Sequence, residues 1–187
     1  MVSINKENGN KNSRMPRLQT KRSIILVGMM GVGKTSIGKK LAERLDLPFV
    51  DADDEIEKAA DLKITEIFER FGEEYFRDGE RRVIGRLLEG KQKVIATGGG
   101  AFINEETRAI IKDKALSIWL NADLDILVER VSRRNHRPLL HGKNPRDVLI
   151  ELGEVRCPIY ALADIHASSD ASPHARTVDQ IMDILTK

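Results

Sequence analysis

A glycine-rich segment near the start of the sequence has the residue types and the spacing of a phosphate-binding loop. Residues 28–35 read Gly-Met-Met-Gly-Val-Gly-Lys-Thr, which matches the G-x-x-x-x-G-K-[ST] pattern in full. Glycines let the backbone turn tightly and direct successive N–H groups toward a polyphosphate. Lys34 is expected to reach the β- and γ-phosphates, and the Thr35 hydroxyl to ligate the Mg²⁺ that bridges them. An ordinary glycine-rich turn is the alternative. The expected phosphate-binding residues are Gly31, Val32, Gly33, Lys34, Thr35 and Ser36.

The segments on either side of this loop have the patterns of a strand and a helix, which a phosphate loop connects. Residues 23–27 form a short apolar run rich in β-branched residues, which is typical of a strand buried in a parallel sheet. A helix is predicted to begin at Thr35, and its apolar stripe consists of Ile37, Leu41, Leu45 and Leu47. The positive end of this helix would favour a bound phosphate.

Carboxylates follow the next predicted strand. Phe49 and Val50 precede the segment Asp51-Ala52-Asp53-Asp54, so the acids fall at the carboxyl edge of the sheet, where ligands of open α/β sheets gather. On an extended stretch, Asp51 and Asp53 would point to the same side. We assign Asp54 to capping a helix that begins near Ile56, since Asp is a preferred N-cap residue.

Three consecutive glycines follow another predicted strand. Residues 93–97 read Lys-Val-Ile-Ala-Thr and continue into Gly98-Gly99-Gly100. Because glycines are entropically unfavourable to order, we expect a backbone that approaches a ligand closely. A flexible turn is the alternative.

A basic, Pro- and Gly-containing stretch at residues 132–145 is predicted to form a mobile loop. His136 and His141 lack the third His or Cys that would complete a metal site, so phosphate or surface contact is the better interpretation. The paired acids, single arginines and basic loop together favour phosphoryl transfer to a hydroxyl of a small acidic acceptor. The sequence has no Asn-Lys-x-Asp segment of the kind that GTPases use to read their base.

The remaining pattern alternates helices and strands. Gly72 is predicted to separate two helices within residues 64–88. Further strands are expected at 115–120 and 164–167, and further helices at 105–113, 124–131, 145–162 and 178–185. This alternation predicts one α/β domain, residues 23–187, with a largely parallel sheet and right-handed crossovers.

Composition narrows the function classes. A net charge of +2 with 32% charged residues does not indicate a nucleic-acid partner. The single cysteine, Cys157, excludes an intramolecular disulfide and suits the cytoplasm. No apolar run has the length of a membrane span. Residues 1–22 are predicted to be a disordered basic tail, and a monomer is expected.

From about Ser23 to near the C-terminus, the sequence resembles the shikimate kinase family of nucleoside-monophosphate-kinase-like P-loop enzymes. The resemblance rests on the order and spacing of six segments, namely residues 28–35, 49–53, 72–77 with Glu80, 98–101, 137–140 and 156–160. It implies ATP-dependent phosphorylation of the shikimate 3-hydroxyl with Mg²⁺, in aromatic amino acid biosynthesis. It also implies a five-stranded parallel sheet of order 2-3-1-4-5 and a mobile lid at about residues 132–145.

The resemblance also implies roles for the acidic and glycine segments. Asp53 would hold the acceptor hydroxyl and take its proton, while Asp51 would bind Mg²⁺ beside Thr35, through water. Gly99 would present its backbone N–H to the substrate.

For the basic residues, the resemblance implies contacts with anions. Arg77 and Arg156 would hold the substrate carboxylate, and Glu80 would orient Arg77. The alternative for Arg77 is a solvated helix salt bridge. Lys34, the lid residue Arg137 and a further basic residue, Arg130, would stabilise the transferred phosphoryl group.

The sequence departs from the family pattern at one position, and two other functions remain open. At the position where family members often have a basic residue near the adenine, this chain has Pro173, with His174 and Arg176 nearby. A kinase acting on gluconate or a nucleotide would keep the phosphate loop without needing Arg77 and Arg156 together. A nucleotide-binding regulatory protein without catalysis is the other class, and the intact Lys34 and Asp53 argue against it.

Overall fold

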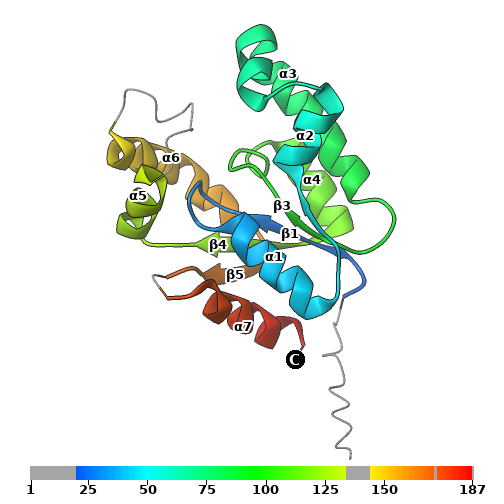
Figure 1. Ribbon diagram of the computed structural model, residues 1–187, viewed down its shortest axis with the longest axis vertical. Helices are drawn as coiled ribbons and strands as arrows, with labels where there is room; N and C mark the ends of the chain where they lie inside the picture. The colour runs from blue at the N-terminus through cyan, green and yellow to red at the C-terminus, as the bar shows by residue number, and fades with distance from the viewer. Residues whose placement is uncertain (1–19, 134–143, 171, 187) are drawn as a thin grey trace, which may run out of the picture.

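The computed structural model describes residues 20–133, 144–170 and 172–186, in which strands and helices alternate (Figure 1). The strands are β1 (Ser23–Val27), β2 (Phe49–Asp51), β3 (Val94–Ala96), β4 (Ala115–Asn121) and β5 (Ile165–Ser168). The helices are α1 (Lys34–Leu45), α2 (Ala52–Ala60), α3 (Ile64–Leu87), α4 (Glu105–Lys114), α5 (Leu124–Ser132), α6 (Pro145–Tyr160) and α7 (His174–Leu185).

The strands form one five-stranded sheet in the order β2-β3-β1-β4-β5, and every neighbouring pair is parallel. This confirms the predicted α/β class and strand order. β1 lies at the centre, and its residues from Ile24 to Val27 are completely buried, as expected for a strand covered on both faces. Because the strands are parallel, the segments that follow β1, β2 and β3 all emerge at the same edge of the sheet.

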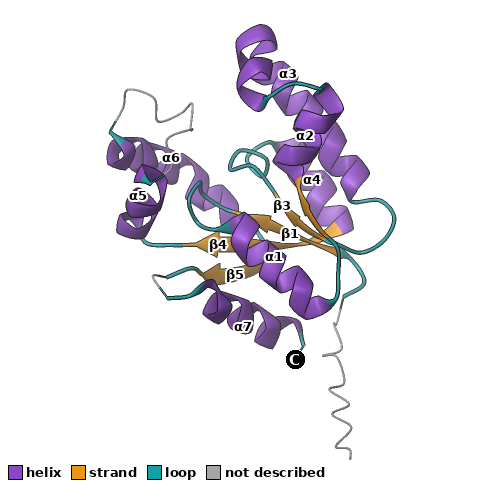
Figure 2. Cartoon of the chain, viewed as in Figure 1, coloured by secondary structure: helices purple, strands orange, loops and turns teal. Residues whose placement is uncertain are grey.

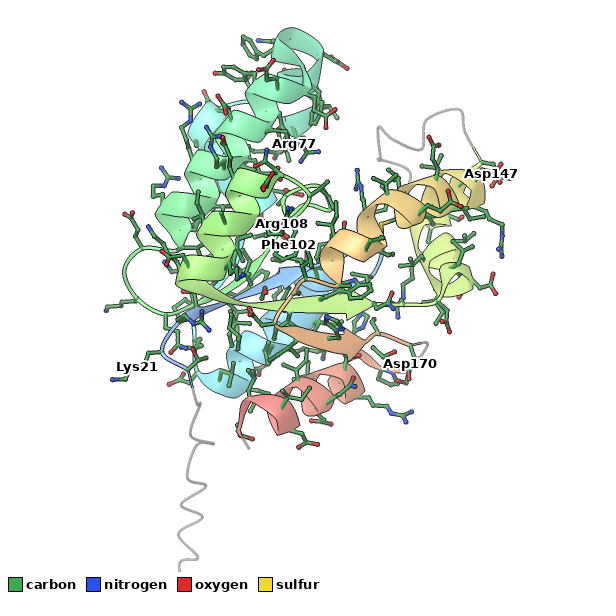
Figure 3. All side chains as sticks on the ribbon, turned by 180° about the vertical axis from the view of Figure 1, so that it is seen from behind. Lys21, Arg77, Phe102, Arg108, Asp147 and Asp170 are labelled. Carbon is green, nitrogen blue, oxygen red and sulfur yellow. The ribbon has the colours of Figure 1, made fainter. Side chains whose placement is uncertain are left out.

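Helices cover both faces of this sheet (Figure 2). α1 and α7 lie in front of it in the view of Figure 1 and pack on each other. The view from behind shows α3, α4 and α6 on the opposite side (Figure 3). The paired helices α2 and α3 and the paired helices α5 and α6 rise on either side of the edge where the strands end.

The predicted break at Gly72 is confirmed. Gly72 lies within α3 with φ 82° and ψ 178°, which are not helical angles, so the helix is kinked there. The positive φ explains why glycine occupies this position. The kink separates the first part of α3 from the part that carries Arg77 and Glu80.

The prediction that Asp54 caps the second helix is wrong. α2 begins at Ala52, and its N-cap is Asp51, whose side chain accepts a hydrogen bond from the Asp53 N–H at 3.1 Å. The helix therefore starts directly at the end of β2, without an extended stretch between. Asp53 consequently lies in the first turn of α2, where its backbone N–H is one of the donors that an N-cap satisfies.

Two sequence predictions fall on residues outside the described ranges. The tail lies there except for its last three residues, and so does most of the predicted lid, including Arg137. None of the helices in the described ranges is both long and apolar enough to cross a membrane.

One polar contact fixes the start of β5 beside β4. The Asp164 carboxylate accepts hydrogen bonds from the N–H and the hydroxyl of Ser117, at 2.8 and 2.7 Å, and Ser117 is 3% exposed. Replacing Asp164 with Ala leaves these buried donors without their acceptor. We expect Asp164→Ala to lower the free energy of unfolding by about 2 kcal/mol, measured by urea denaturation. The matched substitution at exposed Asp183 on α7 should change it little; equal effects of the two would contradict this role.

Candidate active site

A polar cavity of about 410 Å³ opens at the carboxyl edge of the sheet. It brings together the phosphate loop, the acidic segment after β2 and the glycines after β3. The lining residues are Met30, Gly31, Gly33, Lys34, Thr35, Ser36, Asp51, Asp53, Thr97, Gly98, Gly99, Arg130, Arg133 and His174. Most of the residues predicted to bind phosphate or metal therefore face one space. Among those that the structure describes, Val32 is the exception, since it is buried and its carbonyl accepts hydrogen bonds from Arg130 and Ser169.

The phosphate loop has the geometry of an anion site. Gly33 is the N-cap of α1 and has φ 99°, a left-handed conformation that glycine adopts without strain. The first turn of α1 contains no acidic residue of its own, so its N-terminal N–H groups and helix dipole favour a bound anion. The Lys34 ammonium donates to the carbonyls of Gly28 and Met29, at 2.8 and 3.0 Å, which holds it over the loop.

Oxygen ligands suited to a hard cation lie next to this loop. The Thr35 hydroxyl donates to the Asp51 carboxylate at 2.8 Å. No cluster of three or more His, Cys, Asp and Glu side chains gathers into a metal cage in the ranges that the structure describes. Mg²⁺ does not need one, because it keeps several waters and binds through one or two protein oxygens together with phosphates. Thr35 and Asp51 therefore fit a phosphate-bound Mg²⁺.

Asp53 is a partly buried carboxylate with a buried, unused acceptor atom. Its Oδ1 atom has no hydrogen-bond partner among the described residues. Burial, reinforced by the negative charge of Asp51, raises the pKa of Asp53 to about 6, and Lys34 opposes the rise. A carboxylate with this pKa is ionised at neutral pH but binds a proton more tightly than an ordinary carboxylate does. A group that accepts a proton in catalysis needs both properties.

Arg77 and Glu80 form a partly buried ion pair on α3 (Arg77 is labelled in Figure 3). The Arg77 Nη1 donates to Glu80 Oε2 at 2.7 Å, and the Glu80 side chain is only 1% exposed. Glu73 contacts the same guanidinium at 3.2 Å from its exposed side. Burial raises the pKa of Glu80, and the guanidinium opposes this rise. The pair thus fixes the direction of Arg77, and the solvated surface salt bridge considered above does not describe it.

The three glycines after β3 are surrounded by these charged groups. A Cβ atom on Gly98 would lie 2.9 Å from Asp53 Oδ1 and 3.2 Å from Glu80 Oε1, and one on Gly99 would lie 3.3 Å from the Arg156 guanidinium. A Cβ atom on Gly100 would overlap the Arg77 guanidinium. The segment is therefore packed rather than a loose turn, and glycine is needed because the charged side chains approach the backbone closely.

The cavity wall also contains residues that were not among the predicted site residues, namely Met30, Thr97, Gly98, Arg133 and His174, of which Arg133 and His174 have side chains that can carry charge. Arg133, at the end of α5, and His174, at the start of α7, both line the cavity. His174 lies against the phosphate loop, since a Cβ atom on Gly33 would be 3.0 Å from its ring. Its position next to Pro173, which falls where the family often places a basic adenine neighbour, was the available signal for it. Arg133 adjoins the basic stretch and carried no signal of its own.

The phosphate loop follows the central strand of a parallel sheet and shares a cavity with Asp53, while Arg77 and Arg156 lie outside the lining of that cavity, against Gly100 and Gly99. This arrangement is that of a P-loop kinase for a small acidic acceptor. The sequence comparisons give the family. The family described as "Shikimate kinase" matches residues 30–186. The curated "Shikimate kinase" of Caulobacter vibrioides (strain NA1000 / CB15N) is 55% identical over 88% of this chain and 82% of its own length. That of Zymomonas mobilis is 54% identical over 86% and 92%.

Solved structures agree with the sequence matches. A shikimate kinase from Acinetobacter baumannii, solved in complex with shikimate, has a TM-score of 0.84 at 35% identity over 88% of this chain and 93% of its own. One from Aquifex aeolicus has a TM-score of 0.76 at 37% identity over 86% and 94%. The chain belongs to the shikimate kinase family.

The raised pKa of Asp53 predicts a pH-dependent stability effect. Because folding raises this pKa from 3.8 to about 6, the folded state binds the proton more tightly than the unfolded chain. The associated stability is fully present below pH 3.8 and is lost as the pH rises through about 6. We expect Asp53→Asn, which removes this charge, to raise the free energy of unfolding at pH 8 by about 3 kcal/mol at most.

This gain should shrink as the pH falls through about 6, as urea unfolding at several pH values would show. Asp54→Asn is the matched control, because Asp54 is exposed next to Asp53, and it should give no comparable gain. A less stable Asp53→Asn variant at pH 8 would contradict the assignment of a destabilising charge.

Proposed function

We propose that this protein transfers the γ-phosphoryl group of ATP to the 3-hydroxyl of shikimate, giving shikimate 3-phosphate and ADP in aromatic amino acid biosynthesis. The observation that carries the proposal is the position of Asp53. Its carboxylate lines the same cavity as the phosphate loop, and its free Oδ1 atom lies beside Gly98 together with Glu80, the partner of Arg77. Family membership supplies the acceptor, since the Acinetobacter baumannii relative was solved with shikimate.

The phosphate loop is the ATP side of the proposed site. The N–H groups of residues 31–36 and the Lys34 ammonium would hold the phosphates, which carry most of the charge of the transition state. Thr35 and Asp51 would hold Mg²⁺, which supplies electrostatic stabilisation of the transferred group. Arg130 reaches the loop from α5 by donating to the Val32 carbonyl at 3.2 Å. Arg137 stays a prediction as the lid residue that contacts ATP, because it lies outside the described ranges.

Asp53 is the group that would accept the proton of the acceptor hydroxyl. With a pKa of about 6 it is ionised at neutral pH, so its free oxygen would accept a hydrogen bond from the hydroxyl in the ground state. As the O–P bond forms, the hydroxyl proton would pass to this oxygen. The positive charge of Lys34 acts on the Asp53 carboxylate, and the same ammonium would bind the phosphates. Lys34 would therefore lie between the base and the transferred phosphoryl group.

Arg77 and Arg156 would bind the carboxylate of shikimate. Both guanidinium groups lie against the glycines after β3, Arg77 at Gly100 and Arg156 at Gly99. A planar guanidinium matches a carboxylate in a bidentate manner. Two of them from different helices would fix the ring of the acceptor so that one hydroxyl reaches Asp53.

A related small-molecule kinase is the competing enzyme. A gluconokinase from Sinorhizobium meliloti has a TM-score of 0.60 at 19% identity, a likeness that shows the fold alone. ATP turnover stimulated by gluconate or a nucleoside monophosphate, and not by shikimate, would support that alternative. ATP binding without transfer to any acceptor would support a non-catalytic protein.

The first test is the production of ADP from Mg-ATP with and without shikimate. We expect strong dependence on shikimate, and a turnover reduced by about 10²- to 10⁴-fold in Asp53→Asn, because this substitution removes the general base and leaves the phosphate loop intact. ATP binding by the variant, measured by calorimetry, should be retained. Near-normal turnover in Asp53→Asn would contradict the role of this residue.

A second test concerns the carboxylate contact. Arg77→Lys replaces a bidentate fork with a point charge, so we expect the KM for shikimate to rise by about tenfold or more, with the KM for ATP little changed. Arg82→Lys is the matched control, since Arg82 is exposed on the same helix. A shikimate KM that responds equally to both substitutions would rule out a specific contact at Arg77.

A further inference from the structure

We infer that Tyr160 is a positioning residue for the acceptor's carboxylate, acting through the peptide between Gly99 and Gly100. The inference rests on the proposed function, since it concerns how the acceptor side of that site is held. Tyr160 is the last residue of α6, one helical turn after Arg156. It does not line the cavity with the phosphate loop, so its effect on a ligand must be indirect.

Tyr160 is completely buried, and its hydroxyl has a specific partner. The Tyr160 side chain is 0% exposed, and its ring packs 6.1 Å from that of Trp119, measured between centroids. Its hydroxyl donates a hydrogen bond to the Gly99 carbonyl. Burial raises the pKa of Tyr160 to about 12, and the nearby Arg156 charge opposes the rise. The hydroxyl is therefore a neutral donor at any pH at which the protein would be assayed.

This hydrogen bond completes the set of partners for the carbonyls of the three glycines. The Gly98 carbonyl accepts from the Ala101 N–H at 3.4 Å, and the Gly100 carbonyl accepts from the Ile103 N–H at 3.0 Å, both within the turn itself. The Gly99 carbonyl receives its bond from Tyr160 instead. The orientation of one peptide in this turn is thus set from α6, across 61 residues of sequence.

The orientation of that peptide matters because it carries a donor. A trans peptide is planar, so its C=O and N–H point in opposite directions. With the Gly99 carbonyl directed at Tyr160, the Gly100 N–H is directed away from it. Gly100 is a buried residue, yet neither its N–H nor that of Gly99 has an acceptor among the residues that the structure describes.

A buried N–H group without an acceptor is rare in native proteins. Gly100 is buried, whereas Gly99 lines the cavity, and a guanidinium group lies beside each of them. Arg77 lies against Gly100, and Arg156 lies against Gly99. The glycine N–H groups and the two arginines are all donors, so the ligand that satisfies them is an anion with several acceptor oxygens, such as a carboxylate. Tyr160 and Arg156 lie on the same helix, so α6 sets both the peptide and one of the arginines.

The test is Tyr160→Phe, which removes the hydroxyl and keeps the buried ring. We expect the KM for shikimate to rise by about five- to tenfold, which corresponds to the loss of one neutral hydrogen bond, with the KM for ATP unchanged within about twofold. A parallel rise in both KM values, or no rise in that for shikimate, would overturn the inference. Tyr75→Phe is the matched control, since Tyr75 is the other tyrosine of the chain and is half exposed on α3.

A measurement on the wild-type chain tests the same inference without relying on the folding of a variant. In protein labelled with ¹⁵N-glycine, shikimate added without ATP should shift the assigned Gly100 amide resonance. An unmoved Gly100 resonance under saturating shikimate would overturn the inference. Wild-type protein that neither binds nor phosphorylates shikimate would instead contradict the proposed function, so the two failures are distinguishable.

Discussion

The burial of β1 between two parallel neighbours is the constraint on which the site depends. With both faces covered, its residues from Ile24 to Val27 lose all solvent contact, and the strand is fixed in register with β3 and β4, where Leu26 is opposite Ala96 and Ile118. Parallel pairing then brings the ends of β1, β2 and β3 to one edge. The phosphate loop, the acids and the glycines are separated by long stretches of sequence, and this edge alone makes them neighbours.

Charge is concentrated at this edge in a way that opposes folding. Asp53 and Glu80 are carboxylates whose pKa values are raised by burial, and each keeps one oxygen without a partner among the described residues. A chain selected for stability alone would pair or remove such groups. Their persistence here, next to a phosphate loop, is the kind of local conflict that functional sites show. The buried sheet beneath the site stabilises the fold enough to offset the cost of these two carboxylates.

The sequence alone was sufficient for the features that depend on local pattern. The phosphate loop and the kink at Gly72 could be predicted because they follow from a motif and from glycine chemistry, whereas the strand order was implied by the resemblance to the family. The N-cap was assigned to Asp54 because any of the neighbouring acids can cap a helix. Asp51 takes this role because β2 runs into α2 without a connection, and such a junction is set by the packing of both elements. His174 likewise reaches the site through the placement of α7, and its position beside Pro173 marked it as a candidate without showing that it lies against the phosphate loop.

The difference between local pattern and tertiary packing also explains why Tyr160 could be recognised as part of a motif although its role could not be predicted. In the sequence it is an aromatic residue near a helix end, two positions after Pro158, and its spacing from Arg156 says only that the two share a helix face. Its function arises from a contact with a carbonyl 61 residues away, in a segment whose side chains are hydrogen atoms. Where glycines form a site, the surrounding elements have to fix the backbone conformation, because the glycines have no side chains whose packing could fix it. The orientation of each peptide in such a segment is therefore a property of the tertiary structure, and the residues that fix it are found by asking where each backbone carbonyl and N–H finds its partner.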